Sequence, residues 1–514
     1  MSGPAAERLA FAPLHLADRL HPVNPTGDVG LLTLWSPLRA VRRKLDAVDP
    51  AILDPARSRV AVVANLYGDG MYAMLCNLLH NPQVRHLVAI GEPLDLPTVT
   101  ELRAFLADGL EDTTMLDRTL KRVRGTDRLF PDVPAFDAQR LRSTLTFTAL
   151  GKLSDPELGP TLVDLLATLP RADPATIGPR VTVDVATATG EAADAGRVRQ
   201  PSDVTAHQVV RRRPLDAWTE LMVRVSRFGR PVELRSGPRL ELLNVKVVLT
   251  HPAEESEASL ARYGFRLDRF RAYQESILRP ELPEGIAYTY GNRLRGHFPQ
   301  ATTPADTLQS VIDALRANPE SRRGFVALWD TALDLPAGED GDDTAAPCLT
   351  TLFFRRDDDR LALTATYRSH NLLTAWLQNV YGLLAIQRHV AAAVDLPPGP
   401  ITVISHSLGI DPRNPRYAVA RTLDAGWKRD EDLDQDTGKY TLREDPNGYF
   451  VVTADRARGV VVAEHRYAGL LLKRYEGPRA DHLLREIGGD LAVSLVSHAL
   501  WLGHELARCE AELA

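Results

Sequence analysis

The chain has 514 residues, 44% of them hydrophobic and 25% charged, which is typical of a globular protein with about three domains. Its formal net charge of −6 argues against a dedicated nucleic-acid-binding protein, which would carry a strongly basic face. Three widely spaced cysteines exclude a disulfide framework and a zinc knuckle, so we expect the reducing cytosol. The first 30 residues are charged without a long apolar run, and no stretch reaches the roughly 18 apolar residues of a membrane span. We therefore expect neither a signal peptide nor a membrane span.

The N-terminal part predicts an α/β domain over residues 1–170, followed by an Ala-, Pro- and Gly-rich linker over residues 171–207. Its clearest element is a βαβ unit with a strand at 60–64, a helix at 71–80 and a strand at 86–90. The turn Gly68-x-Gly70-x-x-Ala73, with Glu92 after the second strand, mimics a dinucleotide-binding fingerprint. So short a motif is more often a plain tight turn, which we favour over NAD binding.

Residues 208–425 predict a second folded region. We expect a helix opened by Thr303-Pro304, a strand at 325–329, strands at 349–354 and 361–367 around a turn at 355–360, and a helix at 372–390 that polar Gln387 interrupts. An acidic loop over residues 334–346 precedes Cys348. Residues 426–514 begin polar, continue with an apparent strand pair and close with a helical stretch over 481–513, broken at Gly488-Gly489.

Cys348 follows Pro347 at a loop–strand junction, whereas Cys76 lies inside an apolar run that is typical of a packing cysteine. A nucleophilic cysteine needs nearby positive charge, which Arg322-Arg323 or Arg368 could supply. From position alone, a packing role remains the commoner alternative for Cys348 as well.

The strand before Ser369 alternates, with Leu361, Leu363, Ala365 and Tyr367 on one face and Ala362, Thr364, Thr366 and Arg368 on the other. The polar face could line a cleft where Arg368 and Ser369 bind an oxyanion, because a guanidinium donates two parallel hydrogen bonds to phosphate. A solvated strand end is the alternative for Arg368.

Several motifs in the right order together resemble the thymidylate synthase family over about residues 215–412. They are Pro347-Cys348-Leu349, Arg368-Ser369-His370-Asn371, Asn379, Asn318-Pro319-Glu320-Ser321-Arg322-Arg323, Tyr290-Gly291-Asn292-Arg293-Leu294-Arg295 and Arg235-Ser236-Gly237. The spacings of 20 from Cys348 to Arg368 and 11 from Arg368 to Asn379 match that family. The resemblance implies an α/β protein whose α+β central domain (208–425) has a three-layer thymidylate synthase-like fold with a mostly antiparallel or mixed sheet. An N-terminal βαβ domain and a small C-terminal α+β domain (426–514) would flank it.

The resemblance also implies a role for each matching residue. Cys348 would attack carbon 6 of a pyrimidine ring and make carbon 5 nucleophilic. Asn379 would read the base edge and favour a uridylate, Tyr290 would help to remove the carbon-5 proton, and Glu275 is our candidate for the catalytic glutamate. The remaining residues would bind the nucleotide phosphate and sugar (Arg235, Arg322, Arg323, Arg368, Ser369, His406) and the pterin (Asn371). The family further implies a homodimer that shares the paired arginines, and methylene-tetrahydrofolate or methylene-tetrahydromethanopterin as donor, without a metal.

Departures from the family pattern leave alternatives open. They are Leu349 for a histidine, Asn371 for an aspartate, Leu408 for a tyrosine and Arg293-Leu294 for Gln-Trp. A pyrimidine nucleotide hydroxymethylase, which lets water rather than hydride complete the reaction, is one alternative. A catalytically silent nucleotide-binding protein is another, although binding alone needs no thiol.

The flanking segments resemble those of archaeal-type members of the family. Residues 60–91 resemble one of the subunits of the methanogen pterin-dependent methyltransferase, which suggests a helper domain. The C-terminal end resembles the tail of the archaeal-type enzymes, where we expect a solvated or dimer-contact role for His498 and His504 rather than metal binding. Cys509 is expected to pack or to lie at the surface.

Overall fold

The computed structural model describes residues 9–34, 36, 38–66, 70–91, 97–116, 118–151, 153, 155–171, 176–183, 200–234, 237–283, 288–298, 306–335, 346–425, 431–433 and 439–513. By its internal packing the chain forms two compact units, Met1–Ala425 and Gly426–Ala514. Within the described residues no helix is both long and apolar enough to cross a membrane. The motif residues Gly68, Asp69 and Glu92 and the expected cap Thr303 lie outside this part of the chain.

The first sheet has the strand order β1-β3-β2-β4-β8 and is parallel except for the β1–β3 pair. Its strands are β1 (His21–Pro22), β2 (Val29–Leu32), β3 (Val60–Ala64), β4 (His86–Ala89) and β8 (Thr146–Ala149). Its helices are α1 (Leu38–Val48), α2 (Gly70–His80), α3 (Pro97–Asp108), α4 (Ala138–Thr144) and α5 (Leu158–Thr168), with short 3₁₀ turns at Ala17–Arg19 and Pro50–Leu53. The predicted βαβ unit is present, with β2 inserted between its two strands.

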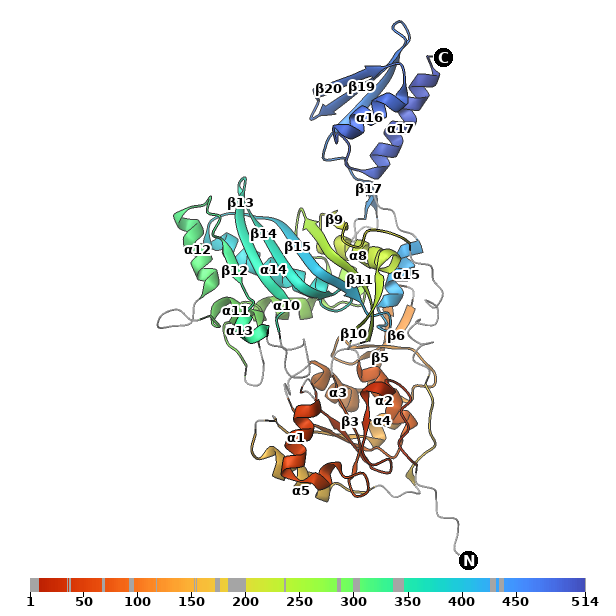
Figure 1. The fold of residues 1–514 in the computed structure, drawn as a ribbon, viewed down its shortest axis with the longest axis vertical. Coiled ribbons are helices and arrows are strands. Elements are labelled where there is room, and N and C mark those ends of the chain that lie inside the picture. Colours follow the sequence, from red (N-terminus) through yellow and green to blue (C-terminus); the bar gives the residue numbers. More distant parts are fainter. Residues whose placement is uncertain are drawn as a thin grey trace, which may run out of the picture. The chain divides into compact units, whose positions relative to one another are not determined.

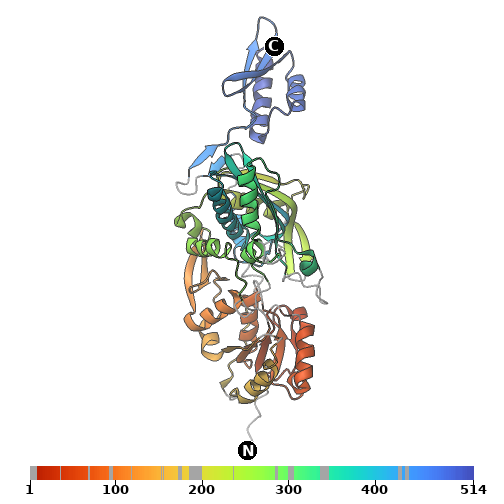
Figure 2. The same ribbon diagram turned by 90° about the vertical axis from the view of Figure 1, so that its left-hand side faces the viewer.

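Both faces of this sheet are covered, as Figure 2 shows. Val41 of α1 and Leu162 of α5 pack with Val60 on one face, and Leu75 of α2 and Leu102 of α3 pack on the other. Apolar residues therefore run almost without interruption along β3, as expected for a strand that is buried on both sides. Cys76 lies in this core, fully buried, and burial raises the pKa of its thiol to about 12. It is a packing residue, as predicted.

A three-stranded meander joins the N-terminal region to the central core. It consists of β5 (Leu110–Met115), β6 (Arg118–Val123) and β7 (Leu129–Pro131). Met115, Leu120 and Leu129 belong to the same apolar cluster as Trp218 of the central region. The Leu116 N–H donates to the Arg262 carbonyl at 3.0 Å. The proposed boundary at residue 170 thus separates segments that share one core.

The central sheet is mixed, with the order β10-β11-β15-β14-β13-β12 and β9 paired to β11 (Figure 1). Its strands are β9 (Gln208–Arg211), β10 (Arg230–Leu234), β11 (Gly237–Leu249), β12 (Phe325–Ala327), β13 (Leu349–Asp357), β14 (Arg360–Asn371) and β15 (Pro398–Ile410). The helices of this region are α8 (Pro214–Phe228), α9 (Glu257–Ala261), α10 (Leu267–Ser276), α11 (Tyr290–Arg295), α12 (Thr307–Ala317), α13 (Thr331–Asp334), α14 (Trp376–Ala393) and α15 (Tyr417–Ala425). The mixed sheet agrees with the expected class; the three-layer detail stays a prediction.

The strand β14 has the predicted alternation, because Leu361, Leu363, Ala365 and Tyr367 are buried and the intervening residues are half-buried. The predicted turn at 355–360 is wrong: both strands continue through the charged residues to a two-residue turn, where Asp358 adopts a left-handed φ of 52°. Charged residues are tolerated there because that end of the hairpin is largely exposed. The strand predicted at 325–329 ends earlier, at Ala327.

Two helix predictions also need correction. Asp306 caps α12, which starts at Thr307 rather than at residue 303, although the buried stripe Leu308, Val311, Ile312 and Leu315 is as predicted. Gln387 does not interrupt the buried face of α14. It is itself fully buried, and its Nε2 donates to the carbonyls of Leu361 at 2.8 Å and Gly399 at 3.0 Å. A buried amide with its donors satisfied can therefore occupy a core position.

Glu255, two residues before α9, is buried, and its protonation provides a test of how the stability of the protein depends on pH. Its carboxylate accepts hydrogen bonds from the Leu215 N–H at 2.8 Å and the Tyr381 hydroxyl at 2.7 Å, yet burial raises its pKa to about 7. Because the folded pKa exceeds the ordinary value of 4.5, the favourable contribution of this group is complete below pH 4.5 and lost as pH rises through 7.

We expect Glu255→Gln to remove that loss, which amounts to about 3 kcal/mol between pH 4.5 and pH 8. The measurement is the urea midpoint of wild type and variant across this pH range. Parallel midpoint curves for the two proteins would contradict the assignment.

The C-terminal unit has a three-stranded sheet, a separate two-stranded sheet and two helices. It therefore has more strands than the predicted pair, whereas the predicted break at Gly488-Gly489 is confirmed, because the first helix ends at Gly489. Its elements are β16 (Glu431–Leu433), β17 (Tyr440–Leu442), β18 (Tyr449–Asp455), β19 (Val460–Tyr467), β20 (Leu470–Gly477), α16 (Ala480–Gly489) and α17 (Val496–Ala511). The solvated role predicted for His498 is wrong, since its Nδ1 lies 2.9 Å from the buried carboxylate of Asp445, and the alternative of a dimer contact stays a prediction. His504 is exposed, and Cys509 packs in the core.

Candidate active site

Cys348 lies immediately before β13 with its thiol partly exposed. Its carbonyl accepts a hydrogen bond of 2.9 Å from the Arg368 N–H, so the two residues are cross-strand neighbours. The pairing register shifts between Leu349 and Thr351, which places a β-bulge directly after the cysteine. A bulge redirects side chains and interrupts the regular alternation. Here the irregular pairing lies at the start of the strand that Cys348 precedes.

Tyrosine side chains gather around Cys348. The Tyr290 hydroxyl, from the first residue of α11, accepts the Leu349 N–H at 3.3 Å. Burial raises the pKa values of Tyr273, Tyr288, Tyr290 and Tyr367, and the proximity of a Cys348 thiolate raises them further. All four phenols therefore keep their protons near neutral pH and can donate hydrogen bonds.

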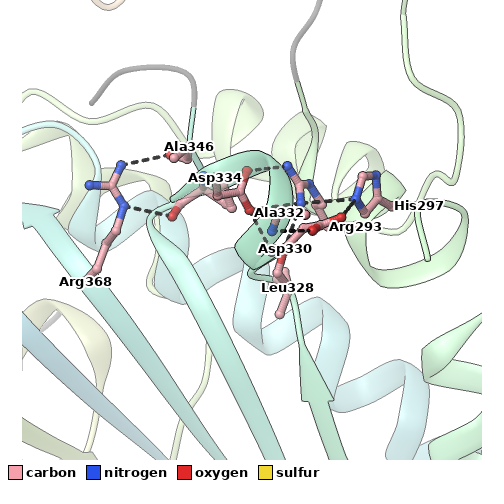
Figure 3. Close-up of polar contacts among 9 residues, drawn as sticks. Arg293, His297, Leu328, Asp330, Ala332, Asp334, Ala346 and Arg368 are labelled. Carbon is pink, nitrogen blue, oxygen red and sulfur yellow. Dashed lines mark hydrogen bonds and ion pairs between the residues drawn. The ribbon is translucent and has the colours of Figure 1, made fainter. Parts of the chain in front are cut away.

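Arg368 holds the residues that precede Cys348. Its Nε donates to the Pro347 carbonyl at 3.1 Å and its Nη2 to the Ala346 carbonyl at 3.0 Å (Figure 3). The guanidinium also lies over the Trp329 ring, 5.7 Å from its centroid. The half-buried arginine is thus not a solvated strand end, and its positive charge lies on the segment that carries Cys348.

Further polar residues of the predicted site lie on neighbouring strands. In the parallel pairing of β14 and β15, Arg368 lies opposite His406, between the pairs Tyr367–Ser405 and Ser369–Ser407. The His406 Nδ1 contacts the Asn244 Oδ1 of β11 at 2.7 Å. Ser369 and His406 are exposed, so both hydroxyl and imidazole can meet a ligand.

Asn379, on α14, is 8% exposed and lies within 3.0 Å of both the Tyr273 hydroxyl and the His370 imidazole. Neither partner was assigned a role from the sequence. Tyr273 could have been found as a continuation of the apolar stripe of α10 between Phe270 and Ile277. In the sequence, His370 stands out only as the residue between Ser369 and Asn371 of the arginine motif. No sequence signal places it against α14, which starts at Trp376.

A buried ion pair joins α11 to the segment leading toward Cys348. The Arg293 Nη1 and Nη2 donate to the two carboxylate oxygens of Asp334 at 3.0 and 2.7 Å, and both side chains are at most 4% exposed (Figure 3). The Asp334 Oδ2 also accepts the Asp330 N–H at 2.7 Å, and the Asp330 carboxylate lies 2.9 Å from the His297 Nε2. The departure at Arg293 is thus matched by a carboxylate partner.

The structure does not bring every predicted residue to this place by a direct contact. Glu275 is on α10 with its side chain 73% exposed, 3.8 Å from Arg279. Arg322 and Arg323 are exposed on the loop before β12. The Asn371 Oδ1 accepts the N–H groups of Leu373 and Thr374, so it caps the turn into α14. Arg235 lies outside the described residues.

Comparison with known proteins identifies the family. The family model for thymidylate synthase matches residues 256–410, and a model described as PterinBD-DUF4346 matches residues 444–514. A protein of Methanothermobacter thermautotrophicus named "Putative thymidylate synthase" is 32% identical over 209 residues, which cover 38% of this chain and 89% of the relative. A protein of the same name from Methanopyrus kandleri is 32% identical over 197 residues, covering 38% and 88%.

The geometry around Cys348 thus lies within a matched domain, and nearly the whole length of these archaeal relatives is aligned. The chain belongs to the thymidylate synthase family. Among the described residues, no group of three or more His, Cys, Asp or Glu side chains could hold a metal ion.

Proposed function

We propose that the protein transfers a one-carbon group to carbon 5 of a pyrimidine nucleotide, most simply converting dUMP to dTMP in the cytosol. The observation that carries the proposal is Cys348 itself. Cys348 is half-buried immediately before β13 and its bulge, with the Tyr290 hydroxyl on the next amide and the Arg368 side chain on the two preceding carbonyls. The thiolate adds to carbon 6, and the electron pair displaced onto carbon 5 makes that carbon a nucleophile.

The nucleotide has a consistent set of binding groups. Asn379 offers an amide oxygen and an amide N–H to the base edge, which suits the N–H and carbonyl of uracil. Arg368 and Ser369, with Arg235, bind the phosphate, and His406 meets the sugar hydroxyl. Arg368 lies opposite His406 across β14 and β15, which agrees with one ligand spanning both.

Removal of the carbon-5 proton requires a base after the one-carbon unit is attached. Tyr290 is protonated in the free protein, so it acts by hydrogen bonding and by passing the proton onward. Glu275 is our candidate for the carboxylate of this network, on the same helix as Tyr273.

A methylene-bearing reduced pterin, of the folate or methanopterin type, supplies the one-carbon unit and, for methylation, the hydride. Asn371 would hold it. Because the Asn371 Oδ1 is engaged by two backbone N–H groups, its amide nitrogen is turned away from the turn and can donate to a pterin carbonyl.

We further propose a homodimer in which Arg322 and Arg323 of one chain reach the phosphate bound by the other. Supporting it, Phe325 and Phe353 are 43% and 48% exposed, with ring centroids 4.6 Å apart on one sheet face. Mixing inactive Cys348→Ser chains with inactive Arg322→Ala/Arg323→Ala chains should restore roughly a quarter of wild-type activity, since half of the chains form mixed dimers with one complete site. No recovery after subunit exchange would contradict shared sites.

Release of tritium from carbon-5-labelled dUMP, with methylene-tetrahydrofolate or methylene-tetrahydromethanopterin as donor, tests the function. Release with a product of the mass of dTMP supports the proposal. A product heavier by one oxygen identifies the hydroxymethylase alternative. Nucleotide binding without release from dUMP, dCMP, UMP or CMP identifies the silent binding protein.

A further inference from the structure

The amide of Asn379 belongs to a chain of buried hydrogen bonds that spans four elements. The Tyr273 hydroxyl of α10 lies 3.0 Å from the Asn379 Oδ1, and the Asn379 Nδ2 lies 3.0 Å from the His370 Nε2 of β14. The His370 Nδ1 lies 2.9 Å from the Ser405 Oγ of β15. His370 and Ser405 are 2% and 1% exposed. His370 and Ser405 are therefore shielded from water and satisfy each other's hydrogen bonds at this end of the chain.

With the Asn379 Oδ1 toward Tyr273 and its Nδ2 toward His370, each hydrogen bond has one direction. An amide nitrogen only donates, so the His370 Nε2 accepts, and the ring carries its proton on Nδ1 and donates to Ser405. An amide oxygen only accepts, so the Tyr273 hydroxyl donates to it. Burial lowers the pKa of His370 to about 3, which agrees with a neutral ring that has one donor and one acceptor.

From this arrangement we infer that His370 is a positioning residue that selects uracil over cytosine by fixing which way the Asn379 amide faces. The inference rests on the proposed function, in which Asn379 reads the base. His370 takes one amide N–H and Tyr273 takes one lone pair of the oxygen. One N–H and one lone pair remain, at fixed positions. A uracil presents a carbonyl and an N–H to them, whereas a cytosine presents the reverse pattern.

The two partners are themselves held firmly. The His370 ring stacks on Tyr367 with centroids 4.0 Å apart and planes 17° apart. The Tyr273 ring lies against Gly382 of α14, where an added Cβ would come within 2.8 Å of it. Turning the amide over would set its oxygen against the Nε2 lone pair. Relief would require the ring to change tautomer and the Ser405 hydroxyl to turn from acceptor to donor.

The test is the ratio of dissociation constants for dCMP and dUMP, measured by calorimetry without pterin. We expect wild type to prefer dUMP by at least ~10-fold, the span of one good bidentate base contact. His370→Phe keeps an aromatic ring but removes the acceptor, and should reduce the ratio at least about fivefold. His370→Gln, whose oxygen can accept from Asn379 while its nitrogen donates to Ser405, should restore most of it. Tyr273→Phe, which removes the opposite partner, should also lower the ratio.

His207→Phe is the matched control. His207 is 7% exposed and bonded to Ser202 at 3.0 Å, but it packs against Phe228 rather than Asn379. The His207→Phe variant should leave the ratio of the dCMP and dUMP dissociation constants unchanged, because a general loss of stability affects the binding of both nucleotides alike. If His370→Phe does not fold, the ratio of dissociation constants measured for Tyr273→Phe decides whether the inference holds. A folded His370→Phe variant that retains the wild-type preference overturns the inference alone. Equal wild-type affinity for the two nucleotides also overturns it. Failure to bind any pyrimidine nucleotide overturns the proposed function.

Discussion

Replacing Cys348 by serine should lower tritium release from carbon-5-labelled dUMP by at least ~10³-fold, because a hydroxyl is ionised far less than a thiol near neutral pH. The nucleotide should still bind, since the proposed phosphate and base contacts come from other side chains, among them Arg368 and Asn379. The measurement compares release rates and dUMP dissociation constants for wild type and variant. We expect the rate to collapse while the dissociation constant changes by less than about threefold.

The other two cysteines provide matched controls. Cys76 is fully buried in α2 and Cys509 packs in the C-terminal unit, so Cys76→Ala and Cys509→Ala test loss of a thiol without loss of the nucleophile. Both should keep release within about threefold of wild type, with a lower unfolding midpoint for Cys76→Ala because of the cavity. Release by Cys348→Ser above a tenth of the wild-type rate would contradict covalent catalysis by this residue.

The immediate surroundings of Cys348 were largely predictable, because they lie within one hairpin. The alternation of β14 fixes which side chains face the core, and antiparallel pairing then sets Cys348 beside Arg368 although they are 20 positions apart in the sequence. The turn was misplaced because charged residues were interpreted as loop. Charge does not oppose a strand where the sheet extends beyond its covering helices.

The contacts that cross between elements were not predictable in the same way. Tyr273, His370 and Asn379 come from a helix, a strand and a second helix, and no period within one element encodes their meeting. The burial of Gln387 contradicts the prediction that it interrupts the buried stripe, since its amide finds partners from distant segments. Specificity on this view resides in the packing between elements, whereas the nucleophile resides in a local motif.

The buried ion pair Arg293–Asp334 should stabilise the protein far more than the partly exposed ion pair Arg295–Asp306, whose arginine lies on the same helix. Asp334→Asn leaves the Arg293 charge buried without a counter-ion, which should cost about 3–5 kcal/mol. Asp306→Asn removes the same charge from Arg295, 2.8 Å away, but those side chains are 26% and 31% exposed and water screens them. Asparagine also preserves the helix cap of α12, so that change should cost less than about 1 kcal/mol.

Urea unfolding of the full chain, followed through the transition of the unit Met1–Ala425, gives the comparison. The Asp334→Asn midpoint should fall well below that of Asp306→Asn. Release of tritium should fall with it, because Arg293 ties the helix of Tyr290 to the segment that leads toward Cys348. Equal midpoints would show that Arg293 finds another counter-charge. An undisturbed reaction with a lowered midpoint would show that the pair supports the fold without positioning the nucleophile.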